Sequence, residues 1–219
     1  MILQAFAVGR LEANCYVVGD EESREVMVID PGDDAPKLLA YFRARDLRVT
    51  TVFATHHHPD HTGGIHELLE ALPEATFAMH RLDYPGVAQS ASFAAAILGH
   101  ELTPPREPDR YVEHGDTIEV GRHSFTALLC PGHTPGSLCL YGEHMVFTGD
   151  ALFAGSIGRS DFPGGDAKQL VESIREHLLT LPDNTTVFPG HNGATTIGDE
   201  RVVNPFLVNP RLTLGIDLD

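Results

Sequence analysis

Short apolar runs that are typical of strands alternate along this chain with apolar positions at helical spacing. In the first half, strands are expected at residues 1–8, 14–19, 25–30, 49–54 and 75–79. In the second half, they are expected at residues 117–120, 124–130, 137–141, 145–148 and 185–188. Helices are expected after Pro36, over residues 63–72 and after Asp166, which is placed to cap its helix. The pattern predicts an α/β fold of mixed sheets with helices outside.

Residues 81–110 interrupt this rhythm. Several prolines and glycines surround one apolar run there, from Phe93 to Leu98. The segment is interpreted as an inserted loop with one helix. Two interpretations of that helix stand side by side: it covers a site or a partner surface, or it packs on the core in the ordinary way.

Candidate chemistry is concentrated in residues 55–61, which read Thr-His-His-His-Pro-Asp-His. His56 and His58 are two residues apart after a buried strand, so an extended backbone directs both side chains the same way. Asp60 and His61 follow where the chain turns into a helix. An aspartate there could serve only as a cap, but capping explains one residue of four. These four residues are therefore interpreted as metal ligands, and His57, which points the other way, as structural or supporting.

Three more metal-type side chains each follow an apolar strand, in a turn with glycine: His133, Asp150 and His191. Strand ends on a common sheet edge are where ligands gather in α/β folds. Either histidine alone is more often a hydrogen-bonded structural residue, but together with residues 55–61 they favour metal binding. Five histidines and two aspartates exceed what one ion takes, so two ions sharing one carboxylate are expected. Imidazole with carboxylate suits zinc, iron or manganese.

The other histidines lack ligand spacing and are expected mostly at the surface: His66, His80, His100, His114, His123, His144 and His177.

Composition narrows the function. The chain has 219 residues, 42% hydrophobic and 21% charged, which is typical of a globular protein that buries a full core. A net charge of −16 disfavours a nucleic-acid partner. Cys15, Cys130 and Cys139 lack C-x-x-C spacing and are expected as buried thiols in a reducing compartment. No basic segment precedes an apolar run at the N-terminus, and no stretch of about 18 apolar residues occurs, so a cytoplasmic protein without a membrane span is expected.

The candidate metal ligands and the residues around them resemble the metallo-β-lactamase superfamily, through five separated motifs that span nearly the whole chain. The resemblance implies an αββα sandwich: one domain over residues 1–219, with an inserted loop and helix at about 81–110. Within the superfamily, the chain looks like the small, single-domain glyoxalase II-like proteins. The segments that carry this closer match are Asn14–Tyr16, Gly149–Phe153, Gly155–Asp166, Thr195–Glu200 and Asn204–Leu207.

The resemblance also divides the ligands. It assigns the first ion to His56, His58 and His133, the second to Asp60, His61 and His191, and the bridge to Asp150. It implies a hydrolase that cleaves a thioester such as S-lactoylglutathione by a metal-bridging hydroxide, with zinc as the first expectation and iron or manganese as alternatives. Asp60 would also orient the nucleophile, as a catalytic residue.

The chain departs from full-length glyoxalase II enzymes, which carry an extra C-terminal helical domain that supplies basic residues for glutathione. Only 28 residues follow His191 here, so the natural substrate stays open. Arg159 is the basic residue expected to contact an anionic substrate, and the alternative is a loop-ordering salt bridge to Asp161 or Asp166. Phe93 is expected to shape the substrate site if the insert covers it.

The runner-up is a persulfide dioxygenase, an oxidoreductase. Such proteins look alike through Gly158–Phe162 and hold one iron with residues matching His56, His133 and Asp150. A non-catalytic metal-binding module is disfavoured, because ligands in turns add nothing to packing. The expected partner is a small-molecule thioester, with no nucleic acid and no membrane, and a homo-oligomer is left open.

Overall fold

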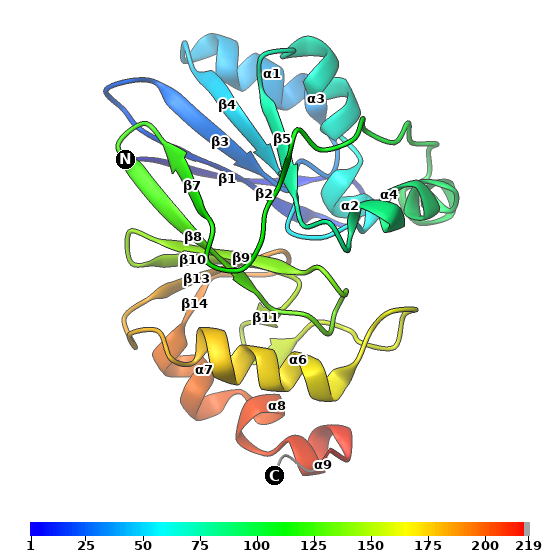
Figure 1. Ribbon diagram of the computed structural model, residues 1–219, viewed down its shortest axis with the longest axis vertical. Coiled ribbons are helices and arrows are strands. Elements are labelled where there is room, and N and C mark those ends of the chain that lie inside the picture. The colour runs from blue at the N-terminus through cyan, green and yellow to red at the C-terminus, as the bar shows by residue number, and fades with distance from the viewer. Residues whose placement is uncertain (217–219) are drawn as a thin grey trace. The chain divides into compact units, whose positions relative to one another are not determined.

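The computed structural model describes residues 1–216 and divides the chain into two compact units (Figure 1). The first unit comprises Met1–Val112 with Thr117–Ser124. The second comprises Glu113–Asp116 with the chain from Phe125 onward. Each unit has its own cluster of buried apolar side chains.

The first unit is built on a six-stranded mixed sheet. Its order is β1 (Ile2–Val8), β2 (Ala13–Gly19), β3 (Glu25–Ile29), β4 (Arg48–Phe53), β5 (Thr76–Met79) and β6 (Arg110–Tyr111). The pairs β1–β2 and β2–β3 are antiparallel, and the three pairs from β3 to β6 are parallel. The parallel strands therefore end at the same edge of the sheet, and the turns that follow β3 and β4 lie there together.

Five helices belong to this unit: α1 (Ala35–Ala44), α2 (Pro59–Thr62), α3 (Ile65–Ala71), α4 (Tyr84–Ala91) and α5 (Ala94–Leu98). Leu38 and Phe42 of α1 and Leu68 of α3 are buried in the apolar cluster of the sheet, and Figure 1 shows both helices beside β3, β4 and β5. The motif 55–61 thus enters a separate short helix, α2, before the helix expected over residues 63–72.

The prediction of one helix in the insert was wrong, because the structure has two. α4 begins directly before Pro85, a residue that was interpreted as a loop signal. Proline is tolerated in the first turn of a helix, where its missing N–H has no intrahelical partner to lose. α5 ends at Gly99, whose φ of 91° only glycine adopts readily.

The second sheet is also mixed. Its order is β14 (Thr195–Thr196), β13 (Thr186–Pro189), β10 (Met145–Gly149), β9 (Leu138–Gly142), β8 (His123–Leu129) and β7 (Thr117–Val120). β10 and β13 are parallel, whereas β8–β9, β9–β10 and β13–β14 are antiparallel. The two parallel strands therefore carry the turns with Asp150 and His191 at one edge.

The expected helix after Asp166 is present as α6 (Ala167–Ser173), which continues as a π-helical turn, Ile174–Leu178. Leu170, Ile174 and Leu178 are fully buried, as their spacing predicted. Several short elements had not been predicted: β6, β14, the hairpin of β11 (Leu152–Phe153) and β12 (Ser156–Ile157), and the helices α7 (Ile197–Val203), α8 (Pro205–Val208) and α9 (Pro210–Leu214).

All three cysteines are buried and free, as predicted. His80 is an exception to the expected surface histidines, being 3% exposed, because it follows the buried strand β5 and accepts a hydrogen bond from the Leu82 backbone. Every helix within the described part of the chain is too short or too polar to cross a bilayer.

Candidate metal centre

The turn after β3 packs directly against the ligand turn after β4. A Cβ at Gly32 would lie 1.6 Å from the backbone oxygen of Asp60, so only glycine fits there. Gly64, just past α2, donates its backbone N–H to the Pro31 carbonyl at 2.8 Å. These two glycines let the backbones touch, and the contact places Asp30 directly against the histidines.

Asp30 organises two of the proposed ligands. Its buried carboxylate accepts hydrogen bonds from the backbone N–H and the hydroxyl of Thr55, each at 2.7 Å, and from Nδ1 of His61 at 3.0 Å. The Thr55 hydroxyl has donated its hydrogen, so it accepts from Nδ1 of His56 at 2.9 Å. Both histidines therefore carry their proton on Nδ1 and present the Nε2 lone pair, the form that binds a metal ion.

The ligand atoms of this first group lie at metal-site spacing. Nε2 of His56 is 3.1 Å from Nδ1 of His58, and Nε2 of His61 is 3.7 Å from Oδ2 of Asp60. Ligands about 2.0–2.2 Å from one ion lie about 2.8–3.6 Å apart at octahedral or tetrahedral angles, so the His56–His58 pair falls inside this range and the Asp60–His61 pair just beyond it. The donor set of the first unit therefore fits divalent cations.

The second unit brings His133, Asp150 and His191 together. Nδ1 of His133 donates to the Arg159 carbonyl at 2.6 Å, which leaves Nε2 as the ligand atom, 3.6 Å from Oδ2 of Asp150. Nε2 of His191 lies 3.7 Å from the same oxygen. A Cβ at Gly158 would lie 1.8 Å from the Asp150 backbone oxygen, so glycine is required beside this turn too. Two imidazoles thus converge on one carboxylate oxygen.

The model of the metallo-beta-lactamase superfamily matches residues 8–191, a span that includes all seven candidate ligands. The chain belongs to this superfamily. A crystal structure of TTHA1623 in a di-iron-bound form aligns with a TM-score of 0.84 at 40% identity, covering 93% of this chain and 100% of that one. The superfamily fold, two mixed sheets flanked by helices, is therefore confirmed.

Two curated relatives of this metallo-β-lactamase superfamily chain differ in activity. Hydroxyacylglutathione hydrolase GloC of Haemophilus influenzae is 34% identical over 210 residues, covering 94% of this chain and 98% of its own. Persulfide dioxygenase ETHE1, mitochondrial, of Homo sapiens is 34% identical over 209 residues, covering 92% and 72%. Superfamily membership indicates a metal-dependent enzyme, and the relatives include both of the activities considered above.

Arg159 has an acidic partner of its own. Its Nε and Nη2 donate to both carboxylate oxygens of Asp161, at 2.9 and 2.8 Å, and its guanidinium lies 4.3 Å from the centre of the Phe162 ring. The hydrogen bond from Arg159 lowers the pKa of Asp161. The salt bridge foreseen as the alternative is therefore present with Asp161, whereas Asp166 caps α6 through the backbone N–H of Gln169. A substrate contact by Arg159 stays a prediction.

Phe93, the other predicted substrate residue, lies directly before α5 and is 45% exposed. A role in substrate binding stays a prediction.

The sequence analysis did not identify the residues that hold the histidines of the motif in place: Asp30, Thr55 and Asp83, which accepts hydrogen bonds from His57. Asp30 follows an apolar strand and precedes Pro31 and Gly32. This is the same pattern that identified Asp150 and His191, so the signal was present but was interpreted only as a turn. Asp83 had no comparable signal, because its partner His57 lies 26 residues away.

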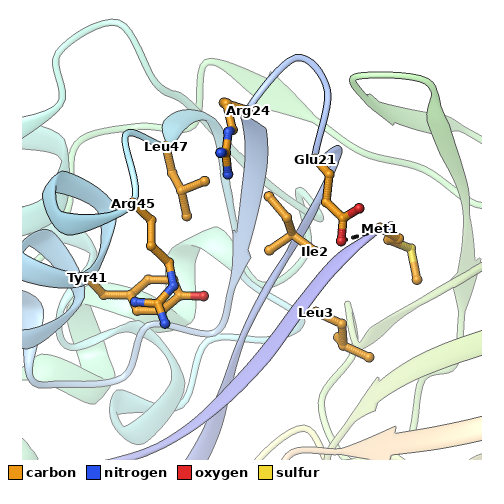
Figure 2. Close-up of a pocket in the computed structure, with 8 residues that line it drawn as sticks. All are labelled: Met1, Ile2, Leu3, Glu21, Arg24, Tyr41, Arg45 and Leu47. Carbon is orange, nitrogen blue, oxygen red and sulfur yellow. Dashed lines mark ion pairs between the residues drawn. The ribbon is translucent and has the colours of Figure 1, made fainter.

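A pocket of about 500 Å³ in the first unit is separate from these ligands (Figure 2). It is lined from β1, from the β2–β3 turn and from α1 by residues that include Ile2, Arg24, Tyr41 and Arg45. The Arg45 guanidinium lies 4.3 Å from the centre of the Tyr41 ring. None of its lining residues is a candidate ligand, so this pocket takes no part in the metal site.

Proposed function

We propose that this chain is a glyoxalase II-like hydrolase that cleaves a thioester such as S-lactoylglutathione with the help of two divalent metal ions. The proposed ligands are those of the sequence analysis: His56, His58 and His133 for one ion, Asp60, His61 and His191 for the other, and Asp150 for both. Zinc is the first candidate. Iron is the second, because the TTHA1623 structure holds two iron ions.

The observation that carries the proposal is that hydrogen bonds fix which ring nitrogen carries the proton in three of the histidines. Asp30 holds His61 directly and His56 through Thr55, while the Arg159 carbonyl holds His133. Each contact places the proton on Nδ1 and leaves Nε2 to bind a cation. Such supporting contacts are typical of metal sites and raise the basicity of the ligands. A core that only needed packing would not require three oriented imidazoles.

Two bound divalent ions would supply a Lewis acid for the carbonyl oxygen and a water of lowered pKa as nucleophile. The residues of the chain supply orientation. Asp60 is 12% exposed, and its Oδ2 lies 3.7 Å from Nε2 of His61. Its carboxylate therefore faces the ligand group, and we propose that it orients the nucleophilic water while also binding an ion. A thiolate leaves readily, so no separate general acid is needed.

The length of the match favours the hydrolase. The chain covers 98% of the GloC hydrolase and 72% of the human dioxygenase at the same 34% identity. The di-iron relative, covered completely, favours two ions rather than one. The natural acyl group stays open, and Arg159 and Phe93 are proposed to contact it.

The second candidate is a persulfide dioxygenase with one iron held by His56, His133 and Asp150. The specific observation in its favour is the human relative, matched over 92% of this chain. In that case Asp60, His61 and His191 would be present without a second ion.

Metal stoichiometry separates the two candidates. We expect about two ions per chain in wild-type protein after purification and reloading. His191→Ala should lower this number to about one and remove most thioesterase activity, because the second ion loses a ligand. If wild-type protein holds one iron, and His191→Ala keeps that iron and oxygen uptake with a persulfide, the dioxygenase replaces the hydrolase.

A further inference from the structure

His57, in the middle of the ligand motif, turns toward the insert. Its backbone N–H and its ring Nδ1 both donate to Oδ2 of Asp83, at 2.9 and 3.0 Å. Asp83 lies directly before α4, and its side chain is 0% exposed. A carboxylate that accepts two hydrogen bonds away from water makes a strong, charge-assisted attachment. The insert is therefore fastened to the ligand turn at its central residue.

Helix α4 also packs against the ring of His57. A Cβ at Gly86 would lie 2.6 Å from both Cγ and Cδ2 of that ring, well inside van der Waals contact. Gly86 lies in the first turn of α4, and glycine is a weaker helix former than alanine, so its presence there calls for a packing reason. The His57 ring supplies that reason, because only glycine lets the helix lie so close.

We propose that Asp83 and Gly86 position the metal-binding turn by holding His57, so that the insert sets the metal affinity of the site. This inference rests on the proposed metal centre. His56 and His58 flank His57 in the turn between β4 and α2. Fixing the peptide and ring of His57 on the insert restrains the backbone between the two ligands, and the His57 ring also contacts the ring of His58, with their centroids 4.9 Å apart. Without this attachment, the turn must be ordered when the ion binds, and affinity falls.

The test measures the affinity of purified apoprotein for Zn²⁺ by competition with a chromophoric chelator. Asp83→Ala should weaken binding on the order of 10- to 100-fold, the usual effect of removing a group that supports metal ligands. Asp83→Asn should keep most of the affinity, because its amide oxygen can still accept from His57. The number of ions bound at saturating Zn²⁺ should stay at the wild-type value.

Asp20→Ala is the matched control. Asp20, in the β2–β3 turn, is also a buried carboxylate, 4% exposed, and it accepts hydrogen bonds from the Glu22 backbone and from the guanidinium of Arg122, which lies between β7 and β8. Its removal should lower the urea midpoint of the apoprotein but leave Zn²⁺ affinity within about twofold of wild type, because none of its bonds reaches the ligand turn.

A second pair of variants tests the ring contact and does not depend on Asp83→Ala being folded. Gly86→Ala should weaken Zn²⁺ binding and lower the urea midpoint of the apoprotein, since the new methyl group collides with the ring of His57. In a His57→Ala background, the same Gly86→Ala change should be harmless or stabilising, because the ring is gone and alanine is the better helix former.

Two results would overturn the proposal: wild-type Zn²⁺ affinity in folded Asp83→Ala, or an equal cost of Gly86→Ala with and without the His57 ring. These readouts need no substrate. If the thioesterase assays fail but the affinity changes appear, the positioning role stands and only the proposed reaction falls. If thioester turnover is found but the affinity changes are absent, the proposed reaction stands and the positioning role falls.

Discussion

Replacing Asp30 by alanine should damage the metal centre without removing any ligand. The change takes one buried carboxylate away from three buried donors: the backbone N–H and hydroxyl of Thr55, and Nδ1 of His61. Each buried donor left without its acceptor costs at least about 1 kcal/mol, so the apoprotein should lose about 3 kcal/mol or more. That is a large share of the free energy of unfolding of a typical domain, which is about 5–15 kcal/mol.

Metal affinity should fall as well. The two histidines that Asp30 holds, His56 and His61, lose the contacts that fix their protons on Nδ1. Loss of such contacts typically weakens metal binding by about 10- to 100-fold, which corresponds to about 1.4 to 2.7 kcal/mol. Asp30→Asn should also weaken it, because its amide nitrogen cannot accept a hydrogen bond from the donors it faces.

The assay pairs urea unfolding of the apoprotein in a chelator with Zn²⁺ titration of the folded protein. Asp20→Ala again serves as the control, with a loss of stability but unchanged affinity. The reasoning is refuted if Asp30→Ala binds Zn²⁺ as tightly as the control does, since Asp30 would then be an ordinary buried polar residue.

Further variants have distinct expected outcomes. Asp150→Ala should abolish activity and lower the metal content in elemental analysis, because this residue is proposed to join both ions. His57→Ala should still bind two ions at saturating metal, since its ring faces the insert, and loss of an ion would contradict that geometry. Phe93→Ala should change KM or substrate preference in steady-state kinetics and leave metal content alone. Asp20, whose pKa is lowered to about 2 by its hydrogen bond with Arg122, should stabilise the fold fully above pH 3.8, its ordinary pKa. The Tm gap between wild type and Asp20→Asn should therefore close as the pH falls from about 4 to 2, and a constant gap would exclude an electrostatic origin.

Most strands and the larger helices could be predicted because burial leaves a pattern in the sequence. The strand at residues 25–30 is apolar on both faces, and Leu170, Ile174 and Leu178 recur at helical spacing. The helices α8 and α9 were missed because segments of four and five residues are too short to show a period, and α7 was missed because Glu200 and Arg201 occupy the positions three and four residues after Ile197. The starts of α8 and α9 did carry signals, since Asn204 and Asn209 each precede a proline and cap a helix.

The candidate ligands could be named from the sequence because they lie in turns directly after strands, where the order of residues is informative. The residues that orient them could not be named with equal ease. Asp30 meets His61 across 31 residues, and Asp83 meets His57 across 26. Such pairs form only when the sheet brings separate turns together, so they depend on register and crossover rather than on local pattern. The single-domain organisation expected over residues 1–219 stays a prediction.

Anaerobic turnover of S-lactoylglutathione by the metal-loaded protein tests the central claim most directly. Thioester hydrolysis needs only water, so release of the thiol should proceed at the same rate with and without oxygen, and a chelator should stop it. The opposite result would be no thiol release from thioesters, combined with oxygen consumption when glutathione persulfide is added. That outcome would contradict the hydrolase and establish the dioxygenase in its place.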